Sequence, residues 1–166
     1  MQFKMNTIFL PRFLSVEFKL GDYKEVPISC LRVGLIGNSA NNIKYVSIEN
    51  TPHYSFALNF IHNLNTQKTF EYLSYECYVE AHPSTCSSEQ FIDLIHKIKK
   101  NGYNSKSNPI MVFRHWSRPF PLKSLDVADG FHRLAILAAL GKTKIRVCKL
   151  EYKYNIFLRI FRKLYK

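Results

Sequence analysis

The sequence lacks the patterns that mark zinc sites, exported proteins and membrane-spanning segments. Its 4 cysteines form no C-x-x-C pair, and no histidine pair occurs at zinc-ligand spacing, so we expect no zinc site. Residues 1–20 alternate apolar with basic side chains and include Pro11, which leaves no continuous hydrophobic run for export or spanning. We therefore expect a reduced cytoplasmic protein whose cysteines serve as ordinary buried apolar side chains.

Acidic residues are also scarce. The chain of 166 residues has 12 Asp and Glu against 24 Lys and Arg, which gives a formal net charge of +12. A field of this size attracts polyanions such as nucleic acids, anionic lipid headgroups and nucleotides, but it does not choose among them. Because 46% of the residues are apolar and 22% are charged, the composition indicates a globular chain with one domain and a real core.

Hydrophobic periodicity predicts a mixed α+β fold, with a small sheet and helices packed on it. We expect strands at 25–33, 44–49, 109–114, 125–128 and 144–150, and helices at 53–75, 89–100 and 131–140. Ser88 is expected to cap the second of these helices, and Gly102 is expected to end it. The predicted organisation is an N-terminal extension over residues 1–24, one domain over 25–150 and a C-terminal helix over 151–166.

Residues 152–166 form a predicted amphipathic helix with basic side chains around its apolar face. The apolar side chains that share this face are Ile156, Phe157, Ile160, Phe161 and Leu164. Such a helix suits an in-plane anchor on an anionic membrane, which would place the protein on the inner face of the cell membrane. Packing of the same face on the protein's own domain is the alternative, and the sequence does not decide between the two.

The run Asp129-Gly130-Phe131-His132-Arg133 carries the strongest functional signal. Gly130 permits a backbone geometry closed to other residues, and the predicted helix then starts with unsatisfied amide groups and its positive dipole end outward. This predicts an anion site, with Asp129 as a Mg²⁺ ligand or base and with His132 and Arg133 as phosphate partners. The alternative is that Asp129 only caps the helix and that the two basic side chains decorate its exposed first turn.

The order of elements around this run resembles the N-terminal domain of ParB, within the ParB/sulfiredoxin superfamily. The helix EQFIDLIHKIKKNG is similar to the family's helix that ends in an I-x-x-x-G turn, and residues 108–112 (NPIMV) resemble its x-P-I-x-V strand. The segment VADGFHRLAILAALGKTKIRV resembles the family's strand, nucleotide-binding turn, helix and final strand, and residues 25–33 are similar to its first strand. The D-G-x-H-R form of the turn looks most like the branch that contains free-serine kinases.

This resemblance implies a nucleotide-dependent phosphotransferase, a kinase that uses ATP or another nucleoside triphosphate with Mg²⁺ to phosphorylate a hydroxyl of a metabolite or sugar. Its nucleotide-binding residues would be Pro109, Ile110, Gly130, Phe131, His132 and Arg133. Asp129 would hold the metal, and Asp129 and His132 would act in catalysis with an upstream carboxylate as base. Glu49 is the first choice for that carboxylate, with Glu25 and Glu76 as others. A membrane-bound C-terminal helix would suit work on a cell-envelope glycan precursor.

Departures from the family pattern narrow the function. Sulfiredoxins carry a reactive cysteine where this chain has Phe131, so sulfinic acid repair is not expected. ParB partition proteins carry G-E-R-R at this place and continue into a helix-turn-helix domain, for which we expect no room in the short stretch after Leu150. Two other classes stay open: a nucleotide-binding or hydrolysing switch, and a nucleic-acid-binding protein, which the net charge favours and the missing DNA-binding domain disfavours.

The substrate side of the predicted site consists of His53, Tyr54 and Arg114. His53 and Tyr54 follow a strand and a turn, where polar side chains can face a site, and His53 would bind substrate or move a proton. The alternative for His53 is a solvent-exposed loop histidine. Arg114, in the run RHWSR, would stack on a base or cradle a substrate anion, although an ordinary hairpin tip explains the run as well.

Overall fold

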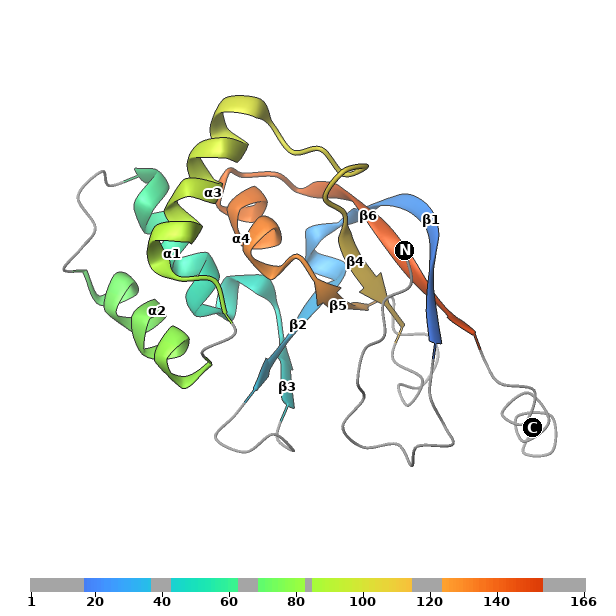
Figure 1. Ribbon diagram of the computed structural model, residues 1–166, viewed down its shortest axis with the longest axis horizontal. Helices are drawn as coiled ribbons and strands as arrows, with labels where there is room; N and C mark the ends of the chain where they lie inside the picture. The colour runs from blue at the N-terminus through green and yellow to red at the C-terminus, as the bar shows by residue number, and fades with distance from the viewer. Residues whose placement is uncertain (1–16, 37–42, 63–68, 83–84, 115–123, 154–166) are drawn as a thin grey trace.

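The computed structural model describes residues 17–36, 43–62, 69–82, 85–114 and 124–153 (Figure 1). Within these ranges six strands form one sheet, in the order β1-β6-β4-β5-β2-β3. The strands are β1 (Glu17–Pro27), β2 (Leu31–Ile36), β3 (Ile43–Val46), β4 (Ile110–Phe113), β5 (Leu125–Asp129) and β6 (Lys144–Lys153). The helices are α1 (Pro52–His62), α2 (Phe70–Ala81), α3 (Ser88–Asn101) and α4 (Phe131–Ala139). The fold is mixed α+β, which confirms the predicted class.

The sheet combines parallel and antiparallel pairs. β6 pairs antiparallel with β1 and parallel with β4, and β2 pairs parallel with β5 and antiparallel with β3. β4 and β5 are antiparallel, and Met111 of β4 lies opposite Asp129 of β5. This register places the beginning of β4 beside the end of β5, where the chain enters α4.

Helix α4 lies between the sheet and the other helices (Figure 1). Its residues Leu134, Ala135 and Ile136 have no exposed surface, and Leu137 and Ala139 are also buried. From Leu134 onward this helix carries only apolar side chains, and such a segment is stable only when other elements surround it; α1, α3 and β4 pack against this one. The burial of its body holds the α4 N-terminus at a fixed position at the end of β5.

The N-terminal part of the predicted organisation needs correction. The strand predicted at 25–33 is two strands, because β1 ends at Pro27 and a 3-10 turn over Ile28–Cys30 precedes β2. Pro27 has φ near −62° and no N–H to give to a ladder, which favours a turn at this point. β1 also begins at Glu17, so residues 17–24 belong to the sheet, whereas the first sixteen residues of the extension lie outside the described ranges.

The helix predicted at 53–75 is also two elements. α1 ends at His62, and α2 begins at Phe70 after Thr69, whose side chain accepts a hydrogen bond from the Tyr72 amide. α2 then continues to Ala81. The strand predicted at 44–49 is β3 and ends at Val46, and a second 3-10 turn over Ile48–Asn50 follows it.

Of the two predicted ends of α3, the first needs correction and the second is confirmed. α3 is capped by Ser87 and not by Ser88: the Ser87 hydroxyl accepts from the Gln90 amide, and the Gln90 side chain accepts from the Ser87 amide. Gly102 ends the helix with φ at 74°, as predicted.

β6 runs to Lys153, so the predicted C-terminal helix does not begin at 151, and residues 154–166 lie outside the described ranges. Among the described residues, none of the helices is long and apolar enough to cross a membrane.

Candidate functional site

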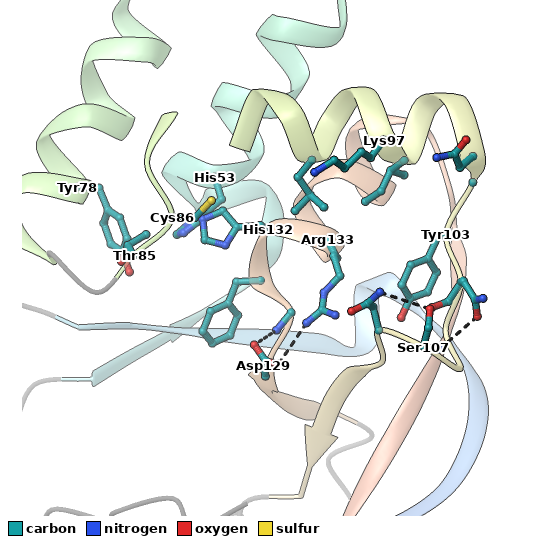
Figure 2. A pocket seen from close by; sticks show the side chains of 18 of the residues that line it. His53, Tyr78, Thr85, Cys86, Lys97, Tyr103, Ser107, Asp129, His132 and Arg133 are labelled. Atoms are coloured by element: carbon teal, nitrogen blue, oxygen red, sulfur yellow. Dashed lines mark hydrogen bonds and ion pairs between the residues drawn. The ribbon is translucent and has the colours of Figure 1, made fainter. Parts of the chain in front are cut away.

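A pocket of about 850 Å³ opens at the N-terminus of α4 (Figure 2). Its walls come from the first turns of α1 and α4, from α2, from α3 and from the loop at residues 101–108. Lys97 and Arg133 lie toward one end of the pocket, and His53 and His132 lie toward the other. A concave space of this size is typical of sites that bind small molecules or cofactors.

We name the two ends of the pocket by their residues. The arginine end comprises Lys97, residues 101–104, 107 and 108, Asp129, Gly130 and Arg133. The histidine end comprises His53, Tyr78, His82, Thr85, Cys86 and His132. The two ends meet at the first turn of α4, because His132 and Arg133 are consecutive in that turn.

The turn into α4 depends on Gly130, which has φ at 93° and ψ at 25°. This left-handed conformation is accessible to glycine without strain. The Asp129 side chain closes the turn: Oδ1 accepts from the Gly130 amide at 2.7 Å, and Oδ2 accepts from the Arg133 guanidinium at 3.2 Å. A side chain at position 130 would also be crowded, because its Cβ would lie 3.1 Å from Cα of Ile110 and 3.0 Å from Cγ1 of the same residue.

The arginine end has the features of an anion site. Among the described residues, no side chain caps the N-terminus of α4, so the first amide groups of the helix remain available to a ligand. Arg133 and Lys97 add two positive charges, and Asp129 is the single carboxylate among the described residues that line the pocket. Asp129 is already paired with Arg133, so the balance of this end is positive.

His132 takes part in a chain of hydrogen bonds that defines its tautomer. The Tyr75 hydroxyl donates to the Cys86 carbonyl at 2.6 Å, and the His132 Nε2 lies 2.8 Å from the same hydroxyl. Since the tyrosine has one proton and gives it to the carbonyl, His132 must donate from Nε2, which leaves a lone pair on Nδ1. Burial, and secondly the adjacent Arg133, lower the pKa of His132 from 6.5 to about 4, with Asp129 acting in the opposite direction. At neutral pH the ring is therefore uncharged.

His53 lies in the first turn of α1 and is only 2% exposed. Its ring contacts those of His132 and Tyr78 edge-on, with centroids 4.8 Å and 4.9 Å away. Nδ1 is buried and has no hydrogen-bond partner among the described residues, an arrangement that costs about 1–3 kcal/mol for a polar group. Burial, followed by the charges of His132 and His82, lowers the pKa of His53 to about 3. The alternative of a solvent-exposed loop histidine is wrong.

The structure brings together most of the residues that the sequence predicts for the site. Asp129, Gly130, Phe131, His132 and Arg133 line the pocket, and so does His53 from a distant part of the chain.

Two further predicted residues lie at the start of β4, outside the pocket lining. Ile110 is fully buried, packs under Gly130 and donates its amide proton to the Tyr103 hydroxyl at 2.9 Å. Pro109 is half-buried just before it, and neither residue lines the pocket.

Other predicted residues lie elsewhere. Glu49 is exposed in the 3-10 turn after β3, and Arg114 is exposed at the end of β4. Tyr54 is half-buried against the hydrophobic core. None of the three lines the pocket, and neither do the alternative carboxylates Glu25 and Glu76. The part of the chain that the structure describes therefore offers no upstream carboxylate to the pocket.

Several pocket residues have no counterpart among the predicted ones. Lys97 lies on the exposed side of α3, and Tyr78 of α2 reaches the pocket through helix packing. Tyr75 of α2 does not line the pocket, but its hydroxyl lies 2.8 Å from Nε2 of His132, which does. The loop at residues 101–108 carried the one available signal, because its run NGYNSKSN is rich in small polar residues. Asn104 orders this loop by accepting hydrogen bonds from the amides of the second and third residues after it.

Comparison with protein-family models, with curated proteins and with solved structures finds no match for this chain. Chemically, the pocket joins a positive, amide-rich end to an end lined by neutral imidazole and phenol groups. The first suits a phosphate, and the second suits a neutral polar compound next to it.

Proposed function

We propose that the protein binds a nucleoside triphosphate at the arginine end of the pocket and transfers its terminal phosphoryl group to the hydroxyl of a small molecule. The observation that carries this proposal is the uncapped N-terminus of α4, with the Arg133 guanidinium beside it in a pocket large enough for a nucleotide. The resemblance of the turn to the D-G-x-H-R kinase branch of the ParB/sulfiredoxin superfamily supports the same function.

Mg²⁺ would enter this site with the nucleotide. Among the described residues, no cluster of three His, Cys, Asp or Glu side chains could hold a metal ion alone. Mg²⁺ usually takes one or two carboxylates together with substrate phosphates, so a single carboxylate is enough. Asp129 fits this role, because its side chain is 57% exposed and each oxygen keeps lone pairs beyond the one hydrogen bond it accepts. The ion would supply neutralisation of phosphate charge.

In the transfer step His132 acts as the base. The hydroxyl oxygen of the small molecule forms a bond to the terminal phosphorus, and the bond from that phosphorus to the bridging oxygen breaks, so that a nucleoside diphosphate leaves. The hydroxyl proton passes to Nδ1 of His132, whose Nε2–H stays on the Tyr75 oxygen. Arg133, Lys97 and the α4 amides stabilise the charge on the transferred group. In this scheme Tyr75 is a positioning residue, and His132 replaces the predicted Glu49 as base.

A switch that binds or hydrolyses the nucleotide without transfer is the second candidate. The observation that favours it is that the described pocket residues include a single carboxylate, Asp129, which is already paired with Arg133. No second carboxylate among them is left to act as the base that a transfer to a hydroxyl would use. In such a protein a water molecule, or no nucleophile at all, would take the place of the acceptor hydroxyl.

Replacing Arg133 with Gln is expected to weaken the binding of ATP with Mg²⁺ by at least about tenfold, because a charge-assisted contact to phosphate is lost. Arg146→Gln is the matched control, because it makes the same change in net charge at an exposed position of β6. The Arg146 guanidinium lies 5.5 Å from the Tyr23 ring centroid, outside the pocket. Isothermal titration calorimetry at fixed ionic strength measures both. An equal loss in the two variants would mean that net charge, and not this pocket, holds the nucleotide.

Replacing His132 with Gln is expected to slow phosphoryl transfer by about a hundredfold and to leave nucleotide affinity unchanged. The Gln amide can still donate to Tyr75, but it cannot take up a proton. Phosphorus NMR of the protein with each nucleoside triphosphate, Mg²⁺ and a panel of hydroxyl compounds follows the products, with exposed His96→Gln on α3 as the control. Free phosphate as the only product would select the switch, and the absence of nucleotide binding would overturn the proposal.

A further inference from the structure

The histidine end contains hydrogen-bonding capacity that phosphate binding does not use. His53 is buried to 98% of its surface, lines the pocket, and has an Nδ1 atom without a partner among the described residues. The His132 ring is next to it, with the two ring centroids 4.8 Å apart. Its Nδ1 carries a lone pair, because Nε2 holds the proton. A buried side chain in a pocket wall whose nitrogen lacks a hydrogen-bond partner points to a ligand that supplies the missing bond.

The charges of the pocket are confined to the arginine end. Lys97, Asp129 and Arg133 are all there, whereas the described residues of the histidine end include no Lys, Arg, Asp or Glu. A carboxylate or an ammonium group placed against His53 would lose its hydration without gaining a charged partner. This end therefore disfavours a free amino acid, which carries both groups.

A hydroxyl group matches what the histidine end offers. A neutral imidazole has one donor and one acceptor nitrogen, and a hydroxyl can donate and accept, so it satisfies His53 in either tautomer. A carboxylate only accepts and an ammonium group only donates. The rings of Tyr78 and His82, stacked with centroids 4.3 Å apart, add flat apolar surface for a carbon skeleton.

We infer that the histidine end is the acceptor subsite and that it takes a neutral polyhydroxylated compound, such as a sugar or a cyclic polyol, in preference to a free amino acid. The assignment of this compound as phosphoryl acceptor rests on the proposed function, whereas its binding does not. The hydroxyl that donates to Nδ1 of His132 is the one that attacks the phosphorus in the transfer step above, and His53 holds a second hydroxyl.

Titration of the nucleotide-free protein tests this subsite directly. The probes are glucose, myo-inositol and L-serine, each added up to the millimolar range in which weak metabolites bind, while the imidazole ¹⁵N resonances of His53 are followed by NMR. We expect glucose or myo-inositol to shift these resonances and L-serine to leave them in place. A shift with L-serine alone, or with none of the three, would overturn the inference.

The substitution His53→Phe keeps a ring in the same place and removes both nitrogens. We expect it to lower the affinity for the polyol by at least about tenfold, with His62→Phe at the exposed end of α1 as the matched control. An unchanged affinity in His53→Phe would contradict the inference. Polyol binding without any nucleotide binding would support the subsite and overturn the phosphotransferase, while nucleotide-dependent phosphorylation of L-serine would do the reverse.

Discussion

Lowering the pH from 6.5 to about 5 is expected to reduce the free energy of unfolding by about 3 kcal/mol, through two buried histidines. Burial is the main cause that lowers the pKa of His53 to about 3 and that of His132 to about 4 in the folded protein. In the unfolded chain both side chains have the ordinary pKa of 6.5 and take up protons that the folded protein does not bind. Stability therefore falls as the pH falls below 6.5, and this contribution levels off only below the folded pKa values.

The surroundings of His53 offer no negative charge that would reduce this loss, whereas Asp129 acts in that direction on the pKa of His132. The rings around His53 belong to Tyr75, Tyr78, Phe91 and His132, and none of them carries a negative charge that would stabilise a protonated imidazole. Since typical domains are stable by about 5–15 kcal/mol, a loss of this size would be a large part of the total. The window above about pH 5 also keeps ordinary carboxylates ionised, so their titration does not obscure the effect.

Urea denaturation at several pH values and constant ionic strength measures this prediction. His53→Phe removes one of the two titrating groups, so about half of the pH dependence should disappear in that variant. His62→Phe makes the same substitution at an exposed position and should keep all of it. An undiminished dependence in His53→Phe would show that the buried pair is not its source.

Local signals made α4 and its turn predictable. An apolar run between Gly130 and Gly141 specifies a buried helix, and the structure places α4 between these two glycines. β1 was harder, because its partner β6 is more than a hundred residues away in the chain, and such pairing leaves little trace in the local pattern. The split of the helix at 53–75 was missed because Thr69 caps α2 without an interruption of Gly or Pro ahead of it.

The pocket was predictable on one side only. The D-G-F-H-R turn is contiguous in the sequence, so its five residues could be recognised as a single anion site. Tyr75 comes 57 positions before His132, and the two are brought together by the packing of α2 against α1 and of α1 against α4. Glu49, the first choice for the base, is the last residue of the strand predicted at 44–49. The 3-10 turn over Ile48–Asn50 instead buries Ile48 and leaves Glu49 exposed, a detail of turn geometry that residue type does not encode.

Gly130 links the fold to the proposed activity, because the turn that it forms starts the helix of the anion site, and the effect of Gly130→Ala is expected to be large. The substitution places a side chain at a φ of 93°, which strains the backbone by about 1–2 kcal/mol. It also forces a Cβ to within 3.1 Å of the Ile110 backbone, which cannot move without disturbing β4. Overpacking of this kind costs about 1–3 kcal/mol more, so we expect a total loss of about 3 kcal/mol.

Gly141→Ala isolates the strain from the clash. Gly141 also has a positive φ, at 77°, but a Cβ there would meet nothing within 4 Å. We expect this variant to lose only about 1 kcal/mol of unfolding free energy in urea denaturation and to bind ATP with Mg²⁺ like the wild type, because Gly141 follows the C-terminal end of α4.

Gly130→Ala should instead lose at least about tenfold in nucleotide affinity, since the new Cβ also lies 3.2 Å from the Arg133 guanidinium and shifts it away from the phosphate. Equal stability losses in the two variants would show that the contact between Gly130 and Ile110 does not constrain the turn. An unchanged affinity in Gly130→Ala would show that the phosphates bind elsewhere in the protein.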